Sequence, residues 1–330
     1  MRQLCLGVES TAHTLGLGIV DSDGRILADV RRTYRPEAGG IHPREAARMM
    51  ADSAGGALRA CFSDSSISPE DLTLVSFSQG PGLGPCLRTG ATLARAIASH
   101  LGVPLVGVNH CVAHIEVGRK YGNSTDPVVL YVSGGSTQTI SYAAGLYRVF
   151  GETEDIAVGN LLDTFAREAG LGFPGGPEVE HLTSSGRELI DLPYAVKGMN
   201  VSFSGLLTRV KGLISTHKLE DICLSLQETA FSMLIEVSER AMAFLGKDEL
   251  ILVGGVGANG RLREMCRIMC SERRASFRAL EPKLCLDNGV MIAWTGLLAK
   301  SVGEETPLPF SQVKPKWRVD KAMVKWRKSS

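Results

Sequence analysis

Residues 127–143, PVVLYVSGGSTQTISYA, repeat a plan that the chain first uses at residues 4–21, LCLGVESTAHTLGLGIVD. Each stretch has an apolar run, a turn of small residues and a second run in which polar and apolar residues alternate. This pattern predicts two β-hairpins. Helix-like and strand-like segments follow each hairpin, so we expect an α/β chain with two lobes that begin in the same way.

The boundary between the lobes is expected at the turn-rich stretch GNSTDP, residues 122–127. This places an N-terminal lobe at residues 1–123 and a C-terminal lobe at residues 124–295. Within the first lobe, residues 43–62 are predicted to be helical, with Ala46, Met50 and Ala54 on one face. Residues 79–90, QGPGLGPCLRTG, are expected to form a loop because they are rich in Gly and Pro.

Bulk composition indicates a soluble globular protein. Of the 330 residues, 44% are hydrophobic and 22% are charged, and no apolar run is long enough to cross a bilayer. The opening residues MRQLCLGVES enter a strand pattern without the apolar segment of a secretory signal. The eight cysteines are scattered and form no C-x-x-C pair, which is typical of reduced, buried thiols. We therefore expect a cytoplasmic protein with no membrane partner.

The formal net charge of +1 argues against strong nucleic-acid binding by the whole surface. The C-terminal segment KPKWRVDKAMVKWRKSS is a local exception, since it holds seven Lys or Arg against one Asp. Trp317 and Trp326 lie among these cations. Two interpretations remain open for this segment: a solvated terminus, or a nucleic-acid-binding element.

Two glycine-rich turns are candidates for phosphate binding. Residues Ser133, Gly134, Gly135 and Ser136 form the turn of the second hairpin, and residues 254–260, GGVGANG, lie between a predicted strand and a predicted helix. Turns of this kind let backbone N–H groups approach an anion, and a helix N-terminus adds partial positive charge. Either turn alone could be purely structural. Three such loops in one chain, one in the opening hairpin and these two in the middle and late parts, favour a nucleotide held between the lobes.

His110 and His114, in NHCVAHIEVGR, are spaced i, i+4. On a helix this spacing places both imidazoles on one face, as chelation of one metal ion requires. The alternative is a pair of structural histidines. The zinc-peptidase motif H-E-x-x-H is absent, because Cys111 occupies the position of its glutamate. Tyr131 and Asp287, each at an element end, are two further candidate ligands, and a set of imidazole, phenolate and carboxylate suits iron better than structural zinc.

Several motifs together resemble the TsaD family, in its archaeal and eukaryotic branch. The resemblance covers about residues 4–325 and is carried by GVESTAHTLGLGIVD, SQGPGLGPCLRTGATLARA, VGVNHCVAHIE, YVSGGSTQTI, GNLLDTFAREAGLGFPGGPEVEHL, MNVSFSGLL, LVGGVGANGRLRE and DNGVMIAWTG. It implies the two-lobed fold of actin, Hsp70 and the sugar kinases (the ASKHA fold), with a nucleotide cleft between the lobes. It also implies that the final helix and tail, residues 296–330, pack on the N-terminal lobe.

The resemblance implies the following site. One metal ion, divalent or ferric, is expected per chain, with iron favoured and zinc or magnesium as alternatives. An adenine nucleotide, either threonylcarbamoyl-AMP or ATP, is the expected ligand. The implied metal ligands are His110, His114, Tyr131 and Asp287. The implied substrate-binding residues are Tyr131, Val132, Ser133, Gly134, Gly135, Asp163, Gly176, Glu180 and Asn259.

The resemblance is not complete. Met49 and Met50 stand where histidines are expected, and Thr164 stands where a lysine is expected. Asn200 replaces an expected aspartate, and Ser136 replaces an expected asparagine. None of these departures removes an expected metal ligand.

Members of the family are catalytic subunits of the KEOPS complex. They transfer a threonylcarbamoyl group from its adenylate to N6 of the adenosine next to the anticodon of tRNA. The implied partners are tRNA, a small dimerising subunit and a small atypical protein kinase, either separate or fused beyond residue 330. Two other functions remain open on the residues: a metal-dependent glycoprotein endopeptidase, and a sugar-kinase-like ATPase module.

Overall fold

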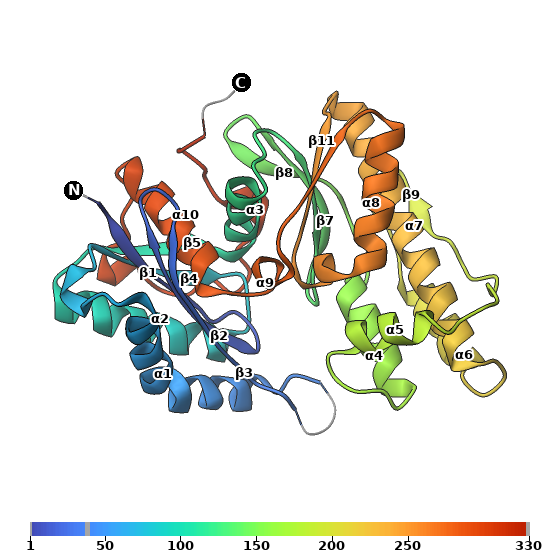
Figure 1. The fold of residues 1–330 in the computed structure, drawn as a ribbon, viewed down its shortest axis with the longest axis horizontal. Coiled ribbons are helices and arrows are strands. Elements are labelled where there is room, and N and C mark those ends of the chain that lie inside the picture. The colour runs from blue at the N-terminus through green and yellow to red at the C-terminus, as the bar shows by residue number, and fades with distance from the viewer. Residues whose placement is uncertain (1, 37–39, 328–330) are drawn as a thin grey trace. The chain divides into compact units, whose positions relative to one another are not determined.

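In the computed structural model, which describes residues 2–36 and 40–327, the chain divides into two compact units (Figure 1). Unit 1 comprises residues 2–36, 40–120, 143–147 and 287–327, and unit 2 comprises residues 121–142 and 148–286. The expected divisions at 123/124 and 295/296 differ from these limits. The main difference is the last helix, which belongs wholly to unit 1 because it packs on the first two strands.

Unit 1 is built on a five-stranded sheet in the order β3-β2-β1-β4-β5. Strands β1 and β2 form the predicted first hairpin, and β1, β4 and β5 run parallel. Helices α1 and α2 pack on one another and on the sheet, and α10 packs on β1 and β2. The elements are β1 (Leu4–Glu9), β2 (Thr14–Asp21), β3 (Ile26–Thr33), α1 (Pro43–Ser65), β4 (Leu74–Gly80), α2 (Gly84–Leu101), β5 (Leu105–Asn109), α3 (His110–Tyr121) and α10 (Gly289–Ser301).

Unit 2 has a second five-stranded sheet, in the order β12-β11-β6-β7-β8, and a two-stranded sheet of β9 and β10. Strands β6 and β7 form the predicted second hairpin, whereas β6, β11 and β12 run parallel. The elements are β6 (Val128–Val132), β7 (Thr137–Ala143), β8 (Leu146–Glu152), α4 (Val158–Glu168), α5 (Gly175–Thr183), β9 (Val196–Lys197), β10 (Asn200–Val201), α6 (Ser204–Leu213), α7 (Leu219–Leu245), β11 (Glu249–Val253), α8 (Gly260–Glu272), β12 (Ser276–Ala279) and α9 (Pro282–Cys285).

Helix α2 corrects one prediction. The stretch 79–90 was expected to be a loop, but the helix already begins at Gly84. Pro85 lies in the first turn, where its missing N–H costs no hydrogen bond. Residue 90, inside the helix, must be glycine because a Cβ there would lie 1.9 Å from the buried Ser10 hydroxyl oxygen. The local signals of a loop are therefore overridden by a helix start and a close packing contact.

The C-terminal segment is not a solvated terminus. As far as residue 327 it lies on unit 1, with Val319, Ala322 and Val324 buried. Its last three residues, 328–330, lie outside the described part of the chain. All eight cysteines are buried and unbridged, which confirms the expected reduced thiols. None of the helices within the described residues combines the length and the apolarity that a bilayer crossing requires.

Helix α10 approaches the sheet at backbone distance. A Cβ on Gly289 would lie 2.1 Å from the Gly18 nitrogen, and a Cβ on Gly7 would lie 2.2 Å from the Gly289 oxygen. Only glycine leaves room for such an approach. The contact fixes the N-terminus of α10, which the Asn288 side chain caps by accepting a hydrogen bond from the Met291 N–H at 2.9 Å.

We predict that Gly289→Ala lowers the free energy of unfolding by about 3 kcal/mol or more, because backbone on both sides would have to move. Gly56→Ala is the matched control: Gly56 lies inside α1, and a Cβ added there would meet nothing within 4 Å. It should stabilise the protein by about 0.5–1 kcal/mol through helix propensity. Urea unfolding of both variants measures the difference, and equal effects would contradict the packing argument.

Candidate metal centre and active site

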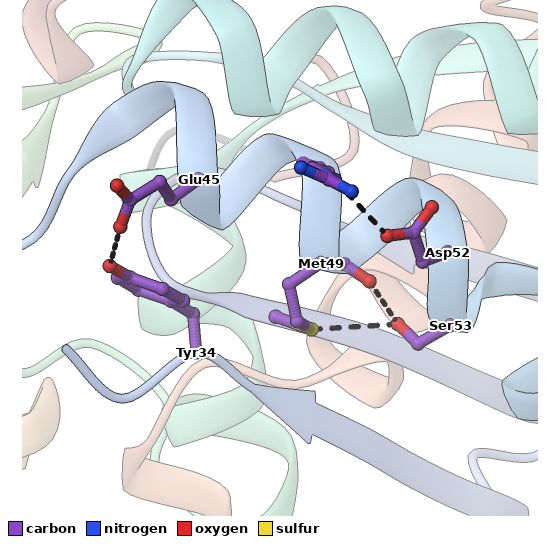
Figure 2. Close-up of a pocket in the computed structure, with 6 residues that line it drawn as sticks. Tyr34, Glu45, Met49, Asp52 and Ser53 are labelled. Atoms are coloured by element: carbon purple, nitrogen blue, oxygen red, sulfur yellow. Dashed lines mark hydrogen bonds and ion pairs between the residues drawn. The ribbon is translucent and has the colours of Figure 1, made fainter. Parts of the chain in front are cut away.

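One open hollow in unit 1 is not the expected site. It has a volume of about 520 Å³ and is lined by Tyr34, Glu45, Arg48, Met49, Asp52 and Ser53 (Figure 2). Its polar groups bond to one another: Tyr34 donates to Glu45, Arg48 pairs with Asp52 at 3.7 Å, and the Ser53 hydroxyl donates to the Met49 carbonyl at 2.7 Å. Met49, which stands where a histidine was expected, lines this hollow. The described lining residues therefore include no imidazole that could bind a metal.

A second polar cluster lies at the carboxyl ends of the parallel strands of unit 1. Glu9 ends β1, Asn109 ends β5, and His110 begins α3. The Asn109 side-chain oxygen accepts hydrogen bonds from the N–H groups of Cys111 and Val112 at 3.0 and 3.1 Å. This cap starts α3 directly after the strand, so that His110 and His114 lie on the first turns of the helix.

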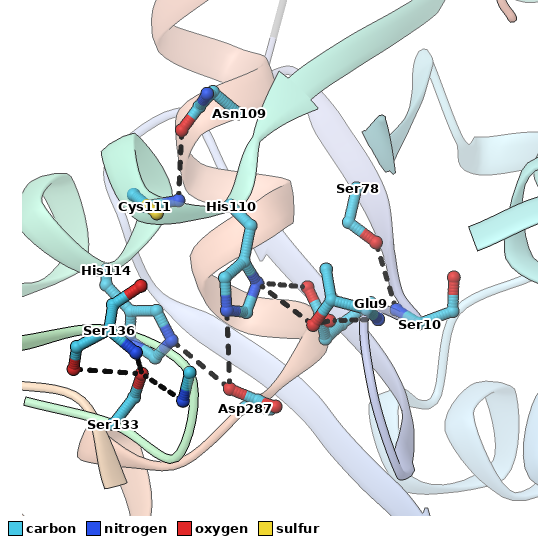
Figure 3. Close-up of polar contacts among 12 residues, drawn as sticks. Glu9, Ser10, Ser78, Asn109, His110, Cys111, His114, Ser133, Ser136 and Asp287 are labelled. Atoms are coloured by element: carbon cyan, nitrogen blue, oxygen red, sulfur yellow. Dashed lines mark hydrogen bonds and ion pairs between the residues drawn. The ribbon is translucent and has the colours of Figure 1, made fainter. Parts of the chain in front are cut away.

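His110, His114 and Asp287 come together in this cluster (Figure 3). Their ligand atoms all lie within 4.8 Å of one another. The Asp287 oxygen Oδ1 lies 3.5 Å from Nε2 of His110 and 3.2 Å from Nε2 of His114. The two imidazole rings stand edge to face, with centroids 4.7 Å apart. The helical spacing thus brings the histidines together as predicted, and Asp287 joins them from the residue before the α10 cap.

Glu9 is a functional residue that the sequence analysis did not single out. Its side chain is fully buried, and its Oε2 lies 3.0 Å from Nδ1 of His110. Its other oxygen, Oε1, accepts from the N–H and the hydroxyl of Thr11, both at 2.6 Å. The signal was available in the sequence, because a carboxylate ends an apolar strand at the edge where parallel strands place ligand sites.

The electrostatics of the cluster favour a positive charge at its centre. Burial disfavours a charged imidazole, but the carboxylates of Glu9 and Asp287 outweigh it and raise the pKa of His110 to about 9. Burial, aided by the neighbouring His110, lowers the pKa of His114. Burial alone would raise the pKa of Asp287, but the two histidines lower it. The carboxylates therefore attract either a proton or a metal cation to this cluster.

The cluster fits a metal ion. Glu9 holds Nδ1 of His110, which leaves Nε2 facing Asp287, and such outer hydrogen bonds are typical of metal-bound histidines. Two imidazoles and one carboxylate form a set that non-haem iron uses and that zinc can also use. Tyr131 lies buried at the end of β6 in unit 2, and its part as a fourth ligand stays a prediction.

The expected substrate-binding residues of unit 2 also gather at strand ends. Tyr131 pairs with Val253 across the parallel strands β6 and β11, so the turn 133–136 and the loop 254–259 leave adjacent strands. Gly254 is required beside this turn, because a Cβ there would lie 2.3 Å from the Val132 oxygen. Adjacent carboxyl ends of parallel strands are where α/β sheets bind ligands.

Two backbone N–H donors of the turn after β6 are already bonded to a side chain of the same turn. The Ser133 hydroxyl accepts from the N–H groups of Gly135 and Ser136 at 3.3 and 3.0 Å (Figure 3). A phosphate at this turn would compete with Ser133 for these two donors. Side chains do not obstruct the approach, since a Cβ on Gly134 or Gly135 would meet nothing within 4 Å.

Three other expected residues form hydrogen bonds with N–H groups at helix starts. Asp163 accepts from the Gly175 N–H at 2.7 Å, beside Gly176 on α5. Glu180 accepts from the Gly260 N–H at 2.7 Å, at the N-terminus of α8. Asn259 caps the same helix through the Leu262 N–H at 3.0 Å and donates to Gln227 at 2.9 Å. Their contacts to a nucleotide stay predictions.

Asn200, one of the departures, has a structural explanation. Its side-chain oxygen accepts from the Glu152 N–H at 3.1 Å, and its side-chain nitrogen donates to Glu154 at 3.2 Å. An aspartate could accept the first bond but would repel the Glu154 carboxylate. Thr164, the other departure near the expected ribose contact, donates to Asn160 at 3.2 Å on α4.

The model of the TsaD family, described as tRNA N6-adenosine threonylcarbamoyltransferase, matches residues 25–294. The chain belongs to the TsaD family. A tRNA N6-adenosine threonylcarbamoyltransferase of Methanococcoides burtonii is 52% identical over 97% of the chain and 96% of its own length. One of Thermococcus sibiricus is 52% identical over 98% of the chain and its whole length.

A longer relative is the probable bifunctional tRNA threonylcarbamoyladenosine biosynthesis protein of Methanosarcina mazei, which is 52% identical over 98% of the chain. The chain spans 59% of the length of that relative.

Solved structures confirm the predicted fold class. HypF of T. kodakarensis has a TM-score of 0.63 at 15% identity, covering 91% of this TsaD chain and 48% of HypF. A ROK-family glucokinase of Streptomyces griseus has a TM-score of 0.50 at 15% identity, covering 89% of this chain and 99% of the glucokinase. The sugar-kinase neighbour and the two mixed sheets with their helices place the chain in the actin, Hsp70 and sugar-kinase class.

We predict that Glu9→Gln weakens metal binding about 10–100-fold, because the substituted amide no longer supplies a charge to Nδ1 of His110. Metal affinity is measured by titration of the chelator-treated protein, followed by metal analysis. Glu249→Gln is the control, since Glu249 is a carboxylate of unit 2 that binds the 124–126 turn. Unchanged affinity in a folded Glu9→Gln variant would contradict the role given to Glu9.

Proposed function

We propose that this chain transfers a threonylcarbamoyl group from threonylcarbamoyl-AMP to N6 of the adenosine next to the anticodon of tRNA. Membership of the TsaD family is the observation that carries the proposal. The cluster of His110, His114 and Asp287 supports it, because a member of a metal-dependent family needs such a set of ligands.

In this proposal, unit 2 holds the adenylate. The residues assigned to it are Tyr131, Val132, Ser133, Gly134, Gly135, Asp163, Gly176, Glu180 and Asn259. Residues 131–135 lie at the end of β6, Gly176 lies at the start of α5, and Asn259 caps α8, while Asp163 and Glu180 bond to the first N–H groups of α5 and α8; this supports the assignment. Backbone N–H groups of the turn would face the phosphate, and carboxylates such as Asp163 are suited to ribose hydroxyl groups.

His110, His114 and Asp287 would hold the metal, with Tyr131 as a further ligand and iron as the favoured ion. When bound, such a cation supplies Lewis acidity toward a carbonyl or phosphate oxygen. Glu9 keeps the His110 ring in one orientation, and the Asn109 cap keeps both histidines on the first turns of α3. The protein thus contributes mainly positioning and electrostatic stabilisation.

The amine attacks the carbonyl directly. A bond forms between N6 and the carbonyl carbon, the bond from that carbon to the phosphate oxygen breaks, AMP leaves with the electron pair of that bond, and the proton lost by N6 passes to solvent. Cys5, Cys61 and Cys223 are disfavoured as nucleophiles, because burial raises the pKa of each thiol to about 12. Thiols of this kind stay protonated at neutral pH.

The peptidase alternative lacks a general base. Cys111 follows His110 where the motif needs glutamate. Glu116, the next carboxylate on α3, is buried and accepts from Tyr147 at 2.7 Å, Trp326 at 3.0 Å and Arg119 at 2.7 Å. The ATPase alternative rests on the fold alone, and folds of this class host many activities.

The proposal includes partners and location. The relatives described as bifunctional support joint action with a second activity, and we assign this to KEOPS subunits, including a small atypical kinase and a small dimerising subunit. The net charge of +1 supports weak tRNA binding by the chain alone. We place the reaction in the cytoplasm.

We predict that the double variant His110→Ala, His114→Ala loses its metal and its transfer activity together, and that Asp287→Ala does the same. The loss in rate should be on the order of 10²–10³, as for other positioned electrostatic groups. Adenine nucleotide binding should weaken but persist, because it depends on unit 2. Mass spectrometry of tRNA nucleosides, after incubation with threonine, bicarbonate, ATP, the adenylate-forming enzyme and partner subunits, measures the transfer.

His217→Ala is the control, because His217 is exposed and its ring forms a hydrogen bond with the Thr216 hydroxyl at 2.9 Å; it belongs to unit 2, whereas the metal cluster belongs to unit 1. It should keep both metal and activity. Normal tRNA modification by the folded double variant would refute the metal assignment. Metal-dependent cleavage of a glycoprotein by the wild type, without tRNA modification, would favour the peptidase instead.

A further inference from the structure

The segment 312–318 is fastened to the carboxyl ends of β4 and β5 in unit 1. The Lys314 N–H donates to the Gln79 carbonyl at 2.7 Å, and the Pro315 carbonyl accepts from the Gly82 N–H at 3.1 Å. The Trp317 carbonyl accepts from the Asn109 side chain at 3.0 Å. A turn closes within the segment, since the Trp317 N–H donates to the Lys314 carbonyl at 3.0 Å. The backbone of this segment is therefore held at several points.

The same contacts place the segment next to the metal centre. Asn109, which holds Trp317, also caps α3 immediately before His110. Gly82, which holds Pro315, lies against Thr11, where a Cβ would be 2.6 Å from the Thr11 oxygen. Thr11 in turn donates to Glu9. A short chain of contacts on each side thus joins the segment to Glu9 and His110.

The side chains of the segment present positive charge. Lys314, Lys316 and Arg318 are exposed, and Lys314 Nζ lies 4.4 Å from the centre of the Trp317 ring. Arg318 pairs with Asp320 at 3.2 Å, whereas Lys314 and Lys316 form no ion pair with described residues. Residues 314–327 hold six Lys or Arg and one Asp, although the whole chain has a net charge of +1. Positive charge is therefore concentrated here.

The two tryptophans of the tail have different roles. Trp326 donates its ring N–H to the buried Glu116 at 3.0 Å, and Arg327 donates to the Tyr147 hydroxyl at 3.2 Å. These bonds anchor the far end of the tail to α3 and to the start of β8. Trp326 is therefore an anchor, whereas the basic side chains at residues 314–318 are exposed, as are Lys321 and Lys325 further along the tail.

We propose that Lys314, Lys316 and Arg318 form a strip that binds the phosphate backbone of the acceptor RNA beside the metal centre. This rests on the proposed function, which supplies an RNA as substrate. A strip of exposed cations on a fixed backbone binds phosphates without reading sequence. Its position beside His110 would guide the RNA strand toward the reacting atoms. Because the whole chain has a net charge of only +1, partner subunits would supply the remaining contacts to the RNA.

The test compares three triple variants of the full chain. Lys314→Gln, Lys316→Gln, Arg318→Gln removes the strip. Arg44→Gln, Arg48→Gln, Arg59→Gln removes the same charge from exposed positions on α1, which packs on α2, β2 and β3. Binding of a fluorescent tRNA transcript is measured by anisotropy from low to physiological salt. A third variant, Lys314→Arg, Lys316→Arg, Arg318→Lys, keeps the charge and should bind like the wild type.

The strip variant should bind tRNA on the order of 100-fold more weakly at about 50 mM salt, and its slope of log affinity against log salt should fall by about 2–3, since each lost phosphate contact contributes about 0.7–0.9. The α1 variant should keep the wild-type slope. An unchanged slope in the strip variant, an equal loss in the α1 variant, or no salt-dependent binding by the wild type would each overturn the proposal. Binding to phosphatidylserine vesicles is measured as well. A strip variant that keeps its tRNA binding but loses its binding to these vesicles would also overturn the proposal.

The transfer assay with partner subunits separates this proposal from the proposed function. The strip variant should raise KM for tRNA and keep kcat, because its residues lie outside the metal cluster. A wild type that binds tRNA through the strip but transfers nothing would refute the proposed function alone. A wild type that transfers normally, with KM unchanged in the strip variant, would refute the strip alone.

Discussion

The packing of α10 on β1 and β2 is the constraint on which the metal centre depends. Asp287 lies 173 residues from His114 in the sequence, and its carboxylate can reach the histidines only if the start of α10 has one fixed position. Backbone contact between Gly289 and Gly18 gives it that position, because atoms at van der Waals distance cannot slide without a clash. The Asn288 cap then fixes the backbone directly before the helix, where Asp287 lies.

This rigidity has an electrostatic consequence. Glu9 and Asp287 are two carboxylates on either side of His110, and Glu9 is fully buried. Buried charges of one sign are unfavourable unless a positive group lies between them. A flexible site would relax by turning one carboxylate to water. The fixed ends of β1, β5 and α10 prevent this, so the cluster keeps its affinity for a cation.

The sequence pattern correctly predicted those features that depend on residues close together in the chain. Alternating residues predicted the β1–β2 and β6–β7 hairpins, and the i, i+4 spacing predicted that His110 and His114 share a helical face. The predicted loop at the start of α2 was wrong because Gly84 and Pro85 form the first turn of a helix, and because Gly90 is required by a close contact with Ser10 rather than by a loop. Long-range contacts were harder to derive: Asp287 was a candidate ligand from its place at an element end, but nothing in the spacing showed that it reaches the histidines. Glu9 was missed although it ends an apolar strand, because its partner His110 lies 101 positions away.

Helix α3 joins these observations. It has 12 residues, too few for a stable isolated helix, and residues 110–118 are all buried. His114 and Glu116 differ by two positions, about 200° around the axis, so they face opposite sides. One side meets Asp287, and the other meets Tyr147 and Trp326, while Arg119 of the same helix pairs with Glu116. The tail and the metal ligands therefore stabilise the same helix, which explains how a segment at the end of the chain can be part of the active-site scaffold.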